Sequence, residues 1–362
     1  MGKKVCELCL SPDLGGLELY MMRASRYLGD TCISVINEKG KLRSYYDDTA
    51  HRYFILKRRN VFLSWLSARD LARIIDDESI DILHVHWTKD LPTAVVAKLL
   101  SNRKPKVVQT RHMTMTRFKD DLYHRFIYRN LDLILAVTHQ VKTQIEKFIP
   151  AQIRPRAEVL YIGAQQPTII SDSEKRSRRE ELGLADSFTV GIVGRIEPQK
   201  GQYIVIDAIE KLIHQGIDAR ALIVGHAMSD DYLAVLEQSI AMRGLSDRII
   251  FTGFTSEAQA MMQLCDVVVL ATENETFGLA LIEAMMCGIC VVGSDSGGPL
   301  EIIDDGINGL LFKTFDADDL VENLMQLEKN SKLRENYAMA GTANVLLLTT
   351  ISLRILLIAW PR

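Results

Sequence analysis

Two glutamates stand eight positions apart in the stretch ENETFGLALIEAMMCG, residues 273–288 of the 362-residue sequence. Glu275 and Glu283 enclose seven mostly apolar residues and come directly after the apolar run DVVVLAT. A helix that only filled a core would need neither carboxylate, whereas an ionised carboxylate can accept hydrogen bonds from two hydroxyl groups at once. The pair is therefore a candidate for binding a ligand. The plainer alternatives are a helix-dipole partner for Glu275 and a surface glutamate for Glu283.

Two cations open the second half of the chain, in VGIVGRIEPQKGQYIVIDAI. Gly191 and Gly194 close an apolar strand, Arg195 follows at once, and Lys200 precedes a predicted helix. A strand that ends in glycine allows close backbone approach, and a helix N-terminus favours anions. Ligands of open α/β domains bind at the carboxyl ends of the strands, so the two cations predict a diphosphate site there. Exposed charges at a strand end are the alternative.

The elements that must position these residues follow an alternating pattern. Short β-branched runs alternate with amphipathic segments, which predicts βαβ units around parallel sheets. In the first half a helix is expected to begin near Leu17, after the Gly15-Gly16 turn. The predicted strands are KKVCELCL, TCISVIN, DILHVHW, KVVQTRH, LDLILAVT and AEVLYIG in the first half, and FTVGIVGRI, ARALIVGHA, RIIFTGF, DVVVLAT and CVVGSDS in the second.

The length of the chain favours two domains. The segment AQQPTIISDSEKRSRREELGL is polar, contains Pro167 and then becomes highly charged, which predicts a linker near residues 165–175. We therefore expect domains at residues 1–167 and 168–340. The remainder, 341–362, is an atypical apolar tail. It is interpreted as a buried crossing helix, a segment lying on a membrane, or an altered end of the chain.

The composition, 48% hydrophobic and 25% charged, is that of an ordinary globular protein. Residues 1–167 hold 27 Lys and Arg against 18 Asp and Glu, while the remainder holds 16 against 28. The basic half favours an anionic partner, such as a phosphorylated glycan or a membrane surface, over simple uneven decoration. Neither a secretory signal nor a membrane-spanning run is evident, so we expect the protein in the cytoplasm, with the inner face of the membrane as a further expectation.

Two C-x-x-C pairs are found among the six cysteines, Cys6/Cys9 and Cys287/Cys290. Four thiolates could form a zinc site. Both pairs lie in apolar runs without the turn residues of a zinc knuckle, so buried thiols are predicted instead.

His84 and His86 flank one residue of a predicted strand, so both side chains point to the same face. The sequence offers no evident third ligand for a metal. We therefore expect the two histidines to border the ligand cleft rather than bind a metal.

Several segments together resemble one large family. In the second half these are GRIEPQKG, ETFGLALIEA and SDSGGPLEIIDDGINGLLF, and in the first half DLGGLELY and DILHVHW. Over roughly residues 4–340 the chain resembles family 4 of the retaining nucleotide-sugar glycosyltransferases. The resemblance implies an α/β protein of the GT-B fold, with two Rossmann-like domains facing across a cleft. The first domain would bind the acceptor and the second the nucleotide sugar.

The resemblance assigns roles to the residues of the second domain. Glu275 would contact the donor hexose, and Glu283 would accept hydrogen bonds from the ribose hydroxyls. The turn and helix start between them would add backbone N–H groups that bind the diphosphate and sugar. These residues are Thr276, Phe277, Gly278 and Leu279.

The cations have a catalytic role in this interpretation. Negative charge grows on the leaving diphosphate, and Arg195 and Lys200 would stabilise it more strongly than the ground state. Gly194 would let the end of the strand approach the ligand. No D-x-D pair stands in a setting that indicates a metal clamp, so we predict metal independence, no metal ligands and no cofactor. The substrate would be a UDP- or GDP-sugar.

In the first domain His112 comes directly after a strand, in VVQTRHMTMTRFKDD. The resemblance implies that His112 hydrogen-bonds the transferred sugar. Gly15 and Gly16 would let the first loop approach the diphosphate and the acceptor closely. A structural histidine and a simple tight turn are the alternatives.

The segment RHMTMTRFKDDLYHRFIYR interleaves basic and aromatic residues and is a candidate for acceptor or membrane contact. An amphipathic helix with Phe126 and Tyr128 packed inward is the alternative. Since no nucleic-acid-binding module is recognised, a nucleic-acid partner is not expected.

The sequence thus predicts transfer of a hexosyl unit from a nucleotide diphosphate-sugar to a glycan or lipid-linked glycan acceptor, in bacterial surface polysaccharide or lipopolysaccharide synthesis. Two alternatives stay open. One is a nucleotide-sugar epimerase on the same fold. The other is a catalytically silent sugar-nucleotide-binding protein, which the unusual tail favours because the family's C-terminal helix commonly braces the first domain.

Overall fold

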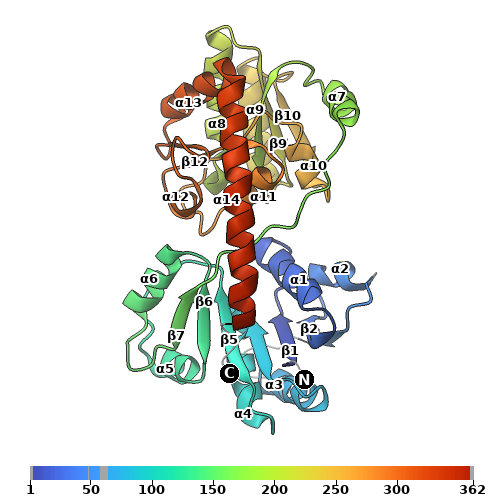
Figure 1. Ribbon diagram of the computed structural model, residues 1–362, viewed down its shortest axis with the longest axis vertical. Helices are drawn as coiled ribbons and strands as arrows, with labels where there is room; N and C mark the ends of the chain where they lie inside the picture. The colour runs from blue at the N-terminus through green and yellow to red at the C-terminus, as the bar shows by residue number, and fades with distance from the viewer. Residues whose placement is uncertain (1–2, 48, 58–63, 359–362) are drawn as a thin grey trace. The chain divides into compact units, whose positions relative to one another are not determined.

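The computed structural model describes residues 3–47, 49–57 and 64–358, which form two compact units, Met1–Tyr161 and Ile162–Arg362 (Figure 1). Each unit contains one parallel sheet with helices on its faces. The predicted boundary after residue 167 lies in the segment that connects the last strand of the first unit to the first helix of the second.

The described residues of the first unit form a seven-stranded sheet of order β3-β2-β1-β4-β5-β6-β7. Because the chain adds strands in one direction from β1 and then restarts at β4, β1 and β4 flank a topological switch point. The strands are β1 Val5–Cys9, β2 Cys32–Asn37, β3 Tyr53–Leu56, β4 Ile82–Val85, β5 Lys106–Arg111, β6 Leu133–Ala136 and β7 Arg156–Val159. The helices are α1 Gly16–Leu28, α2 Ser44–Asp47, α3 Ser64–Asp77, α4 Leu91–Leu100, α5 Leu122–Arg129 and α6 His139–Phe148.

The second unit repeats this plan with a six-stranded sheet of order β10-β9-β8-β11-β12-β13, so its switch point lies between β8 and β11. The strands are β8 Phe188–Val193, β9 Ala219–Val224, β10 Ile249–Gly253, β11 Val267–Leu270, β12 Cys290–Ser294 and β13 Leu310–Phe312. The helices are α7 Asp172–Glu181, α8 Gln202–His214, α9 Asp230–Met242, α10 Ala258–Met262, α11 Leu279–Met286, α12 Pro299–Ile302, α13 Ala317–Lys329 and α14 Ser331–Ile358.

All eleven strands predicted from the sequence are present, and α1 begins next to the expected Leu17. The two strands that were not predicted, β3 and β13, are short edge strands of four and three residues. β3 is only partly buried, so its sequence YFIL carries no clear alternation of buried and exposed positions.

The core of the second unit follows from the parallel sheet. Strand β11 reads VVVL and is buried along its whole length, as expected for a strand covered by helices on both faces. Helix α8 packs against the neighbouring strands β8 and β9, with Ile204 and Ile209 in the core, and α13 packs beside α8, with Leu320 and Leu324 in the same core. Burial of these apolar side chains holds the carboxyl edge of the sheet in place.

The predicted apolar tail continues a helix that starts before it. Helix α14 runs from Ser331 to Ile358, and its Tyr337 is buried in the core of the second unit. The Thr342 hydroxyl donates to the Met285 carbonyl oxygen of α11 at 2.7 Å. Across the described part of the chain we find no helix with the length and apolar character needed to cross a bilayer. Residues 359–362 of the tail lie outside the described residues.

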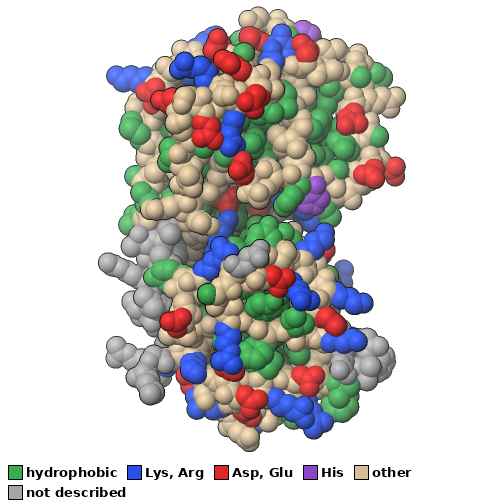
Figure 2. Space-filling view, turned by 90° about the vertical axis from the view of Figure 1, so that its right-hand side faces the viewer, with side chains coloured by type: hydrophobic (Ala, Val, Ile, Leu, Met, Phe, Trp, Pro, Cys, Tyr) green, Lys and Arg blue, Asp and Glu red, His purple; other side chains and the backbone are tan. Residues whose placement is uncertain are grey.

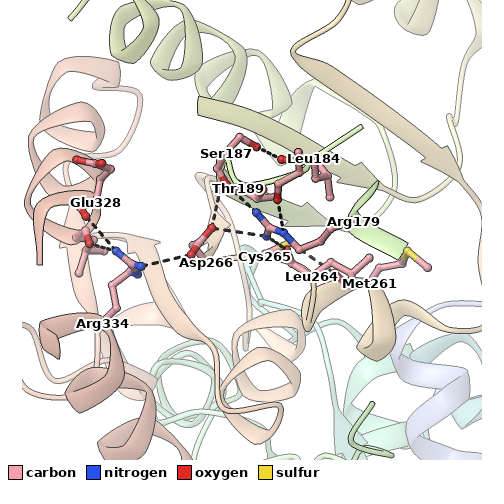
Figure 3. Close-up of polar contacts among 12 residues, drawn as sticks. Arg179, Leu184, Ser187, Thr189, Met261, Leu264, Cys265, Asp266, Glu328 and Arg334 are labelled. Carbon is pink, nitrogen blue, oxygen red and sulfur yellow. Dashed lines mark hydrogen bonds and ion pairs between the residues drawn. The ribbon is translucent and has the colours of Figure 1, made fainter. Parts of the chain in front are cut away.

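Asp266 fastens α14 to the amino-terminal ends of the strands, as Figure 3 shows. Its carboxylate accepts from the Thr189 backbone N–H at 2.9 Å and from the Arg334 guanidinium of α14 at 3.4 Å. The guanidinium of Arg179 lies 3.8 Å from the same carboxylate and donates to the Ser187 carbonyl oxygen at 2.7 Å. One carboxylate thus links β8, α7 and α14 at the edge opposite the strand ends that carry Arg195 and Glu275.

Replacing Asp266 with alanine is expected to destabilise the protein by about 1–3 kcal/mol, because the Thr189 backbone N–H loses its acceptor and two largely buried guanidinium groups lose the carboxylate that pairs with them. Urea unfolding would measure this. The control is Glu322→Ala on the exposed face of α13, which should change the free energy of unfolding by no more than about 0.5 kcal/mol. Equal stabilities of the two variants would contradict the role given to Asp266.

Candidate functional site

The switch point of the second unit gathers the charged residues of the predicted site. Arg195 and Lys200 follow β8, and Glu275 follows its neighbour β11. Because the connections leave these two strands in opposite directions, a crevice opens at their carboxyl ends, where doubly wound domains bind ligands. The topology thus places the predicted cations and the first glutamate at one edge of the sheet.

Lys200 and Glu275 meet although 75 positions separate them in the sequence. The Lys200 Nζ donates to Glu275 Oε2 at 2.9 Å, and the two side chains are 25% and 19% exposed. This partial burial weakens solvent screening, so the pair is a stronger electrostatic feature than an exposed ion pair. A lysine held this way can donate to an additional anion, because an ammonium group has three donors.

Gly201 allows this close approach. Its backbone is left-handed, with φ 72°, and a Cβ placed there would lie 2.1 Å from the Ala271 carbonyl oxygen at the end of β11. Only glycine fits such a position. The absence of a side chain therefore lets the Lys200 turn lie against the strand that leads to Glu275.

A second glycine fixes the main chain of Glu275. Gly297, with φ 65°, lies so close that a Cβ there would be 2.2 Å from the Glu275 carbonyl oxygen. The backbone N–H of Gly298 donates to that oxygen at 2.8 Å, and the Ser296 hydroxyl donates to the Glu273 carbonyl oxygen at 2.6 Å. The loop after β12 therefore supports the loop after β11. This Gly-Gly pair belongs to the segment SDSGGPLEIIDDGINGLLF, whose sequence alone does not indicate this contact.

Helix α11 begins where the sequence places it. Gly278 precedes it, Leu279 is its first residue, and Phe277 is buried. Thr276, like Glu275, is partly exposed in the loop before the helix. Glu283 lies more than one turn further along α11 and is partly exposed.

Arg195 has a different environment from Lys200. Its guanidinium pairs with Glu197 at 3.1 Å and its side chain is 50% exposed. The buried Gln202 donates to the Arg195 carbonyl oxygen at 2.9 Å, which holds the main chain just after Gly194. The backbone of Arg195 is thus fixed, while its side chain is half exposed to solvent and paired with Glu197, which the sequence did not reveal as a partner.

In the first unit His112 directly follows β5, as predicted. Its Nε2 lies 3.4 Å from Nδ1 of His86, and the Tyr20 ring of α1 stands edge-on to His112, with ring centroids 5.2 Å apart. Gly16 is the first residue of α1, and Gly15 before it has an extended backbone, with φ −160°. Any residue can adopt that conformation, so a tight turn does not require glycine at position 15.

His84 and His86 have the third neighbour that the sequence did not reveal. Glu7 of β1 is in register with His84 of β4, and its carboxylate contacts His84 Nδ1 at 2.9 Å and also His86 Nε2. The other nitrogen of His84, Nε2, lies 2.7 Å from the Thr110 hydroxyl. The three side chains are fully buried, so the expectation that the histidines border an open cleft and lack a third partner is wrong. The sequence signal that could have indicated this partner is Glu7 itself, a single acidic residue in the apolar strand VCELC.

Comparison with known proteins decides the family. A family model described as "Glycosyl transferases group 1" matches residues 174–343, and one described as "Glycosyl transferase 4-like" matches residues 7–139. The chain belongs to the group 1 glycosyltransferases.

Alignments with individual relatives extend over most of this glycosyltransferase. The N-acetyl-α-D-glucosaminyl L-malate synthase of Bacillus anthracis is 25% identical over 81% of this chain and 76% of its own length. An uncharacterized glycosyltransferase of Methanocaldococcus jannaschii is 26% identical over 91% of this chain and 89% of its own. The crystal structure of Anabaena HepE in complex with UDP and glucose has a TM-score of 0.85 at 23% identity, with 99% of both chains covered. The predicted GT-B fold with two Rossmann-like units is thereby confirmed.

In the buried cluster of this glycosyltransferase, the pKa values of Glu7, His86 and His112 are all lowered. Burial lowers the pKa of His86 to about 4, the neighbouring His84 adds to this, and Glu7 offsets it only in part. Burial, together with His86 and His84, holds the pKa of His112 well below its usual range. Burial alone would raise the pKa of Glu7, but the charges and hydrogen bonds of His84 and His86 outweigh it and hold that pKa at about 2.

The free energy of unfolding of the glycosyltransferase should fall between pH 7 and pH 5. In this window an unfolded histidine takes up a proton, whereas folded His86, with a pKa of about 4, does not. The unfolded state then binds more protons, so stability decreases as the pH falls, by about 2 kcal/mol for this group. The groups that face His86 are Glu7, His84, His112 and Tyr20; the pKa of Glu7 contributes only at lower pH.

Urea unfolding at stepped pH values measures this dependence. The variant His86→Gln should show a smaller loss over the same window. A loss of stability that is identical in the variant and the wild type would contradict the assignment.

The cysteines are confirmed as buried thiols. All six are free and buried. Burial is the main cause that raises the pKa of Cys287 and of Cys290 to about 12, so both stay protonated at neutral pH. Of the described residues, no set of three or more that includes cysteine brings its ligand atoms within metal-binding distance.

The basic and aromatic segment forms α5, capped by Asp121, whose side chain accepts from the His124 backbone N–H at 3.0 Å. Tyr128 is buried, but Phe126 is 44% exposed, so the alternative in which both rings pack inward holds for Tyr128 and not for Phe126. The segment leaves several large apolar side chains exposed, namely Met113, Phe118, Leu122, Tyr123 and Phe126. On the face shown in Figure 2, basic side chains are spread over the first unit rather than gathered in one patch.

Proposed function

We propose that this protein is a retaining glycosyltransferase that moves a hexosyl unit from a UDP- or GDP-sugar to a glycan or lipid-linked glycan acceptor. The observation that carries the proposal is the half-buried Lys200–Glu275 pair at the switch point of the second unit. The family matches over both units and the structural similarity to a protein crystallised with UDP and glucose support it.

The diphosphate would lie between the loops that follow β8 and β11. Lys200 would share its ammonium group between Glu275 and a phosphate oxygen, and Arg195 would turn from Glu197 toward the diphosphate. Backbone N–H groups at the start of α11 add donors for the same anion. As the bond from the anomeric carbon to phosphate breaks, negative charge grows on the leaving group and these donors stabilise the transition state most.

The carboxylates would hold the two sugars of the donor. Glu275 would accept from hydroxyl groups of the hexose, since its main chain is fixed by the loop that contains Gly297. Glu283, partly exposed on α11, would accept from the ribose hydroxyls. Retention of the anomeric configuration is carried over from the family resemblance.

The first unit would bind the acceptor. The exposed apolar side chains around α5, among them Leu122 at 87% exposure, suit an amphiphilic acceptor or peripheral contact with a membrane. A role in surface polysaccharide or lipopolysaccharide synthesis, and the cytoplasmic location, stay predictions.

Transfer activity should persist in excess EDTA, because Arg195 and Lys200 provide fixed positive charge in place of a metal ion. The measurement is the initial rate of nucleotide release before and after chelation, with Mg²⁺ and Mn²⁺ added back. A rate that collapses with EDTA and recovers with either metal would contradict metal independence.

The function itself is tested by incubating the protein with UDP-, GDP- and ADP-sugars and a panel of lipid-linked and free glycans, with product analysis by NMR. The proposal expects a new glycosidic bond of the donor's anomeric configuration. An isomerised sugar nucleotide formed without an acceptor would identify an epimerase instead. Binding of sugar nucleotides without any turnover would identify a silent binding protein.

A further inference from the structure

A buried polar cluster lies at the switch point of the first unit, directly behind His112. Glu7 lies on β1, His84 and His86 lie on the adjacent β4, and all three side chains are fully buried. Burying a carboxylate in an apolar sheet costs free energy unless its oxygens are hydrogen-bonded. Both oxygens of Glu7 have imidazole partners, so the cluster is a satisfied hydrogen-bonded unit.

The cluster has two branches that start at the carboxylate. One runs from Glu7 to His84 and ends at the Thr110 hydroxyl, which lies 2.7 Å from His84 Nε2. The other runs from Glu7 to His86 Nε2, and from His86 Nδ1 to His112 Nε2 at 3.4 Å. Only the second branch reaches His112, which the family resemblance places beside the transferred sugar.

The ligand atoms of Glu7, His84 and His86 also lie within 4.8 Å of one another, the spacing of a candidate metal site. A metal ion would need the lone pair of one nitrogen on each histidine to point at a common centre. The nitrogens nearest Glu7 instead face its carboxylate oxygens at hydrogen-bond distance, and an ionised carboxylate only accepts. Those nitrogens must therefore carry protons, which favours a hydrogen-bonded network over a metal centre.

The protons of the second branch follow from the carboxylate. Because Glu7 can only accept, the proton of neutral His86 lies on Nε2, and its Nδ1 is left as an acceptor. His112 Nε2 lies 3.4 Å from that acceptor, which favours the proton of His112 on Nε2. The lowered pKa values of His86 and His112 agree with neutral rings.

We propose that Glu7, acting through His86, is a positioning residue that fixes the tautomer and orientation of His112, so that His112 Nδ1 faces the substrate as a hydrogen-bond acceptor. This inference rests on the proposed function for the identity of the substrate hydroxyl. Within the described parts of the chain no protein partner is found for His112 Nδ1, and the side chain is partly exposed.

Tyr20 of α1 packs against the rings of His86 and His112 and restricts the positions they can take. Its ring stands edge-on to both His86 and His112, with centroids 5.6 Å and 5.2 Å away and interplanar angles of 64° and 65°. A flip of the His112 ring about the Cβ–Cγ bond would keep this packing but would put the carbon Cε1 where Nε2 now faces His86, so the hydrogen bond to His86 is what selects the present orientation. Glu7 holds His86 in place, and His86 in turn selects the orientation of the His112 ring.

The tautomer is tested directly by long-range ¹H–¹⁵N NMR of the full chain labelled in its histidines, with His112→Gln to assign the resonances. The inference expects His112 in the wild type to be neutral and protonated on Nε2. In Glu7→Gln, which keeps the shape but can donate as well as accept, the two tautomers of His112 should become mixed. The same variant should lower kcat about 10–100-fold with little change in the KM of the donor.

Thr110→Val is the matched control, because it breaks the other branch, is equally buried and lies two residues before His112. It should keep the wild-type tautomer even if thermal unfolding shows a loss of stability. A wild-type His112 protonated on Nδ1, an unchanged single tautomer in folded Glu7→Gln, or a metal ion found by elemental analysis of the purified protein would each overturn the inference. The NMR result needs no turnover, so a failure of the proposed function would appear separately, as the absence of transfer by the wild type.

Discussion

Replacing Lys200 with alanine is expected to lower kcat by about 10²–10³-fold, the usual cost of removing one fixed donor from a developing negative charge. The Lys200 ammonium lies 2.9 Å from Glu275 in a site where both side chains are largely shielded from water. Its loss removes a charge that the leaving diphosphate needs and leaves the carboxylate of Glu275 without this partner. Steady-state kinetics with a saturating nucleotide sugar measure the effect.

Lys211→Ala is the matched control. Lys211 also belongs to the α8 region and donates to Asp318, but it is 39% exposed and lies outside the loops that follow β8 and β11. Exposed ion pairs contribute little, so kcat and stability should stay near the wild-type values. A Lys200→Ala enzyme as active as Lys211→Ala would show that Lys200 does not act on the leaving group.

Gly297→Ala is expected to lower kcat by about 100-fold while the fold is kept. A Cβ at position 297 would lie 2.2 Å from the Glu275 carbonyl oxygen, so the loop after β12 must move away from the loop after β11. The hydrogen bond from Gly298 N–H to that oxygen, 2.8 Å in the native chain, would lengthen or break. A misplacement of about 1 Å at a reacting centre can cost about 10²-fold.

Gly306→Ala is the control that separates the effect of the clash at position 297 from the effect of a left-handed backbone on stability. Gly306 has a similar left-handed backbone, with φ 72°, but open space surrounds the position of its missing Cβ. Both variants should lose roughly 1 kcal/mol of stability from the disfavoured conformation. Only Gly297→Ala should lose activity. If the two variants have the same kcat, the support that Gly297 gives to Glu275 is not required for turnover.

The buried parallel strands were predictable because their apolar runs are long and bounded by turn signals, as in VVVL of β11. Strand β3 escaped prediction because a short, partly exposed edge strand needs no buried stripe. The alternative that packed both Phe126 and Tyr128 inward could not be decided from the sequence, because helical spacing alone does not tell which side of α5 meets the protein. In the structure the neighbouring Ile127 and Tyr128 are buried instead.

The site shows the same division. Lys200 and Glu275 could be selected from the sequence because each follows an apolar strand at a position where ligands bind. The contact between Lys200 and Glu275 could not be predicted, since it depends on β8 and β11 being neighbours and on the close approach of Gly201 to Ala271. Glu7 was missed for a related reason: only the register between β1 and β4 brings it to His84 and His86. The partner of Arg195, Glu197, lies two residues away, where spacing gives no sign of pairing.

A crystal structure of the protein with a bound UDP- or GDP-sugar tests the central claim most directly. The account predicts a diphosphate within hydrogen-bond distance of Lys200 Nζ and the N–H groups at the start of α11, with Glu275 on the hexose and Glu283 on the ribose. A nucleotide sugar bound away from the carboxyl ends of β8 and β11, with the Lys200–Glu275 pair undisturbed, would contradict it.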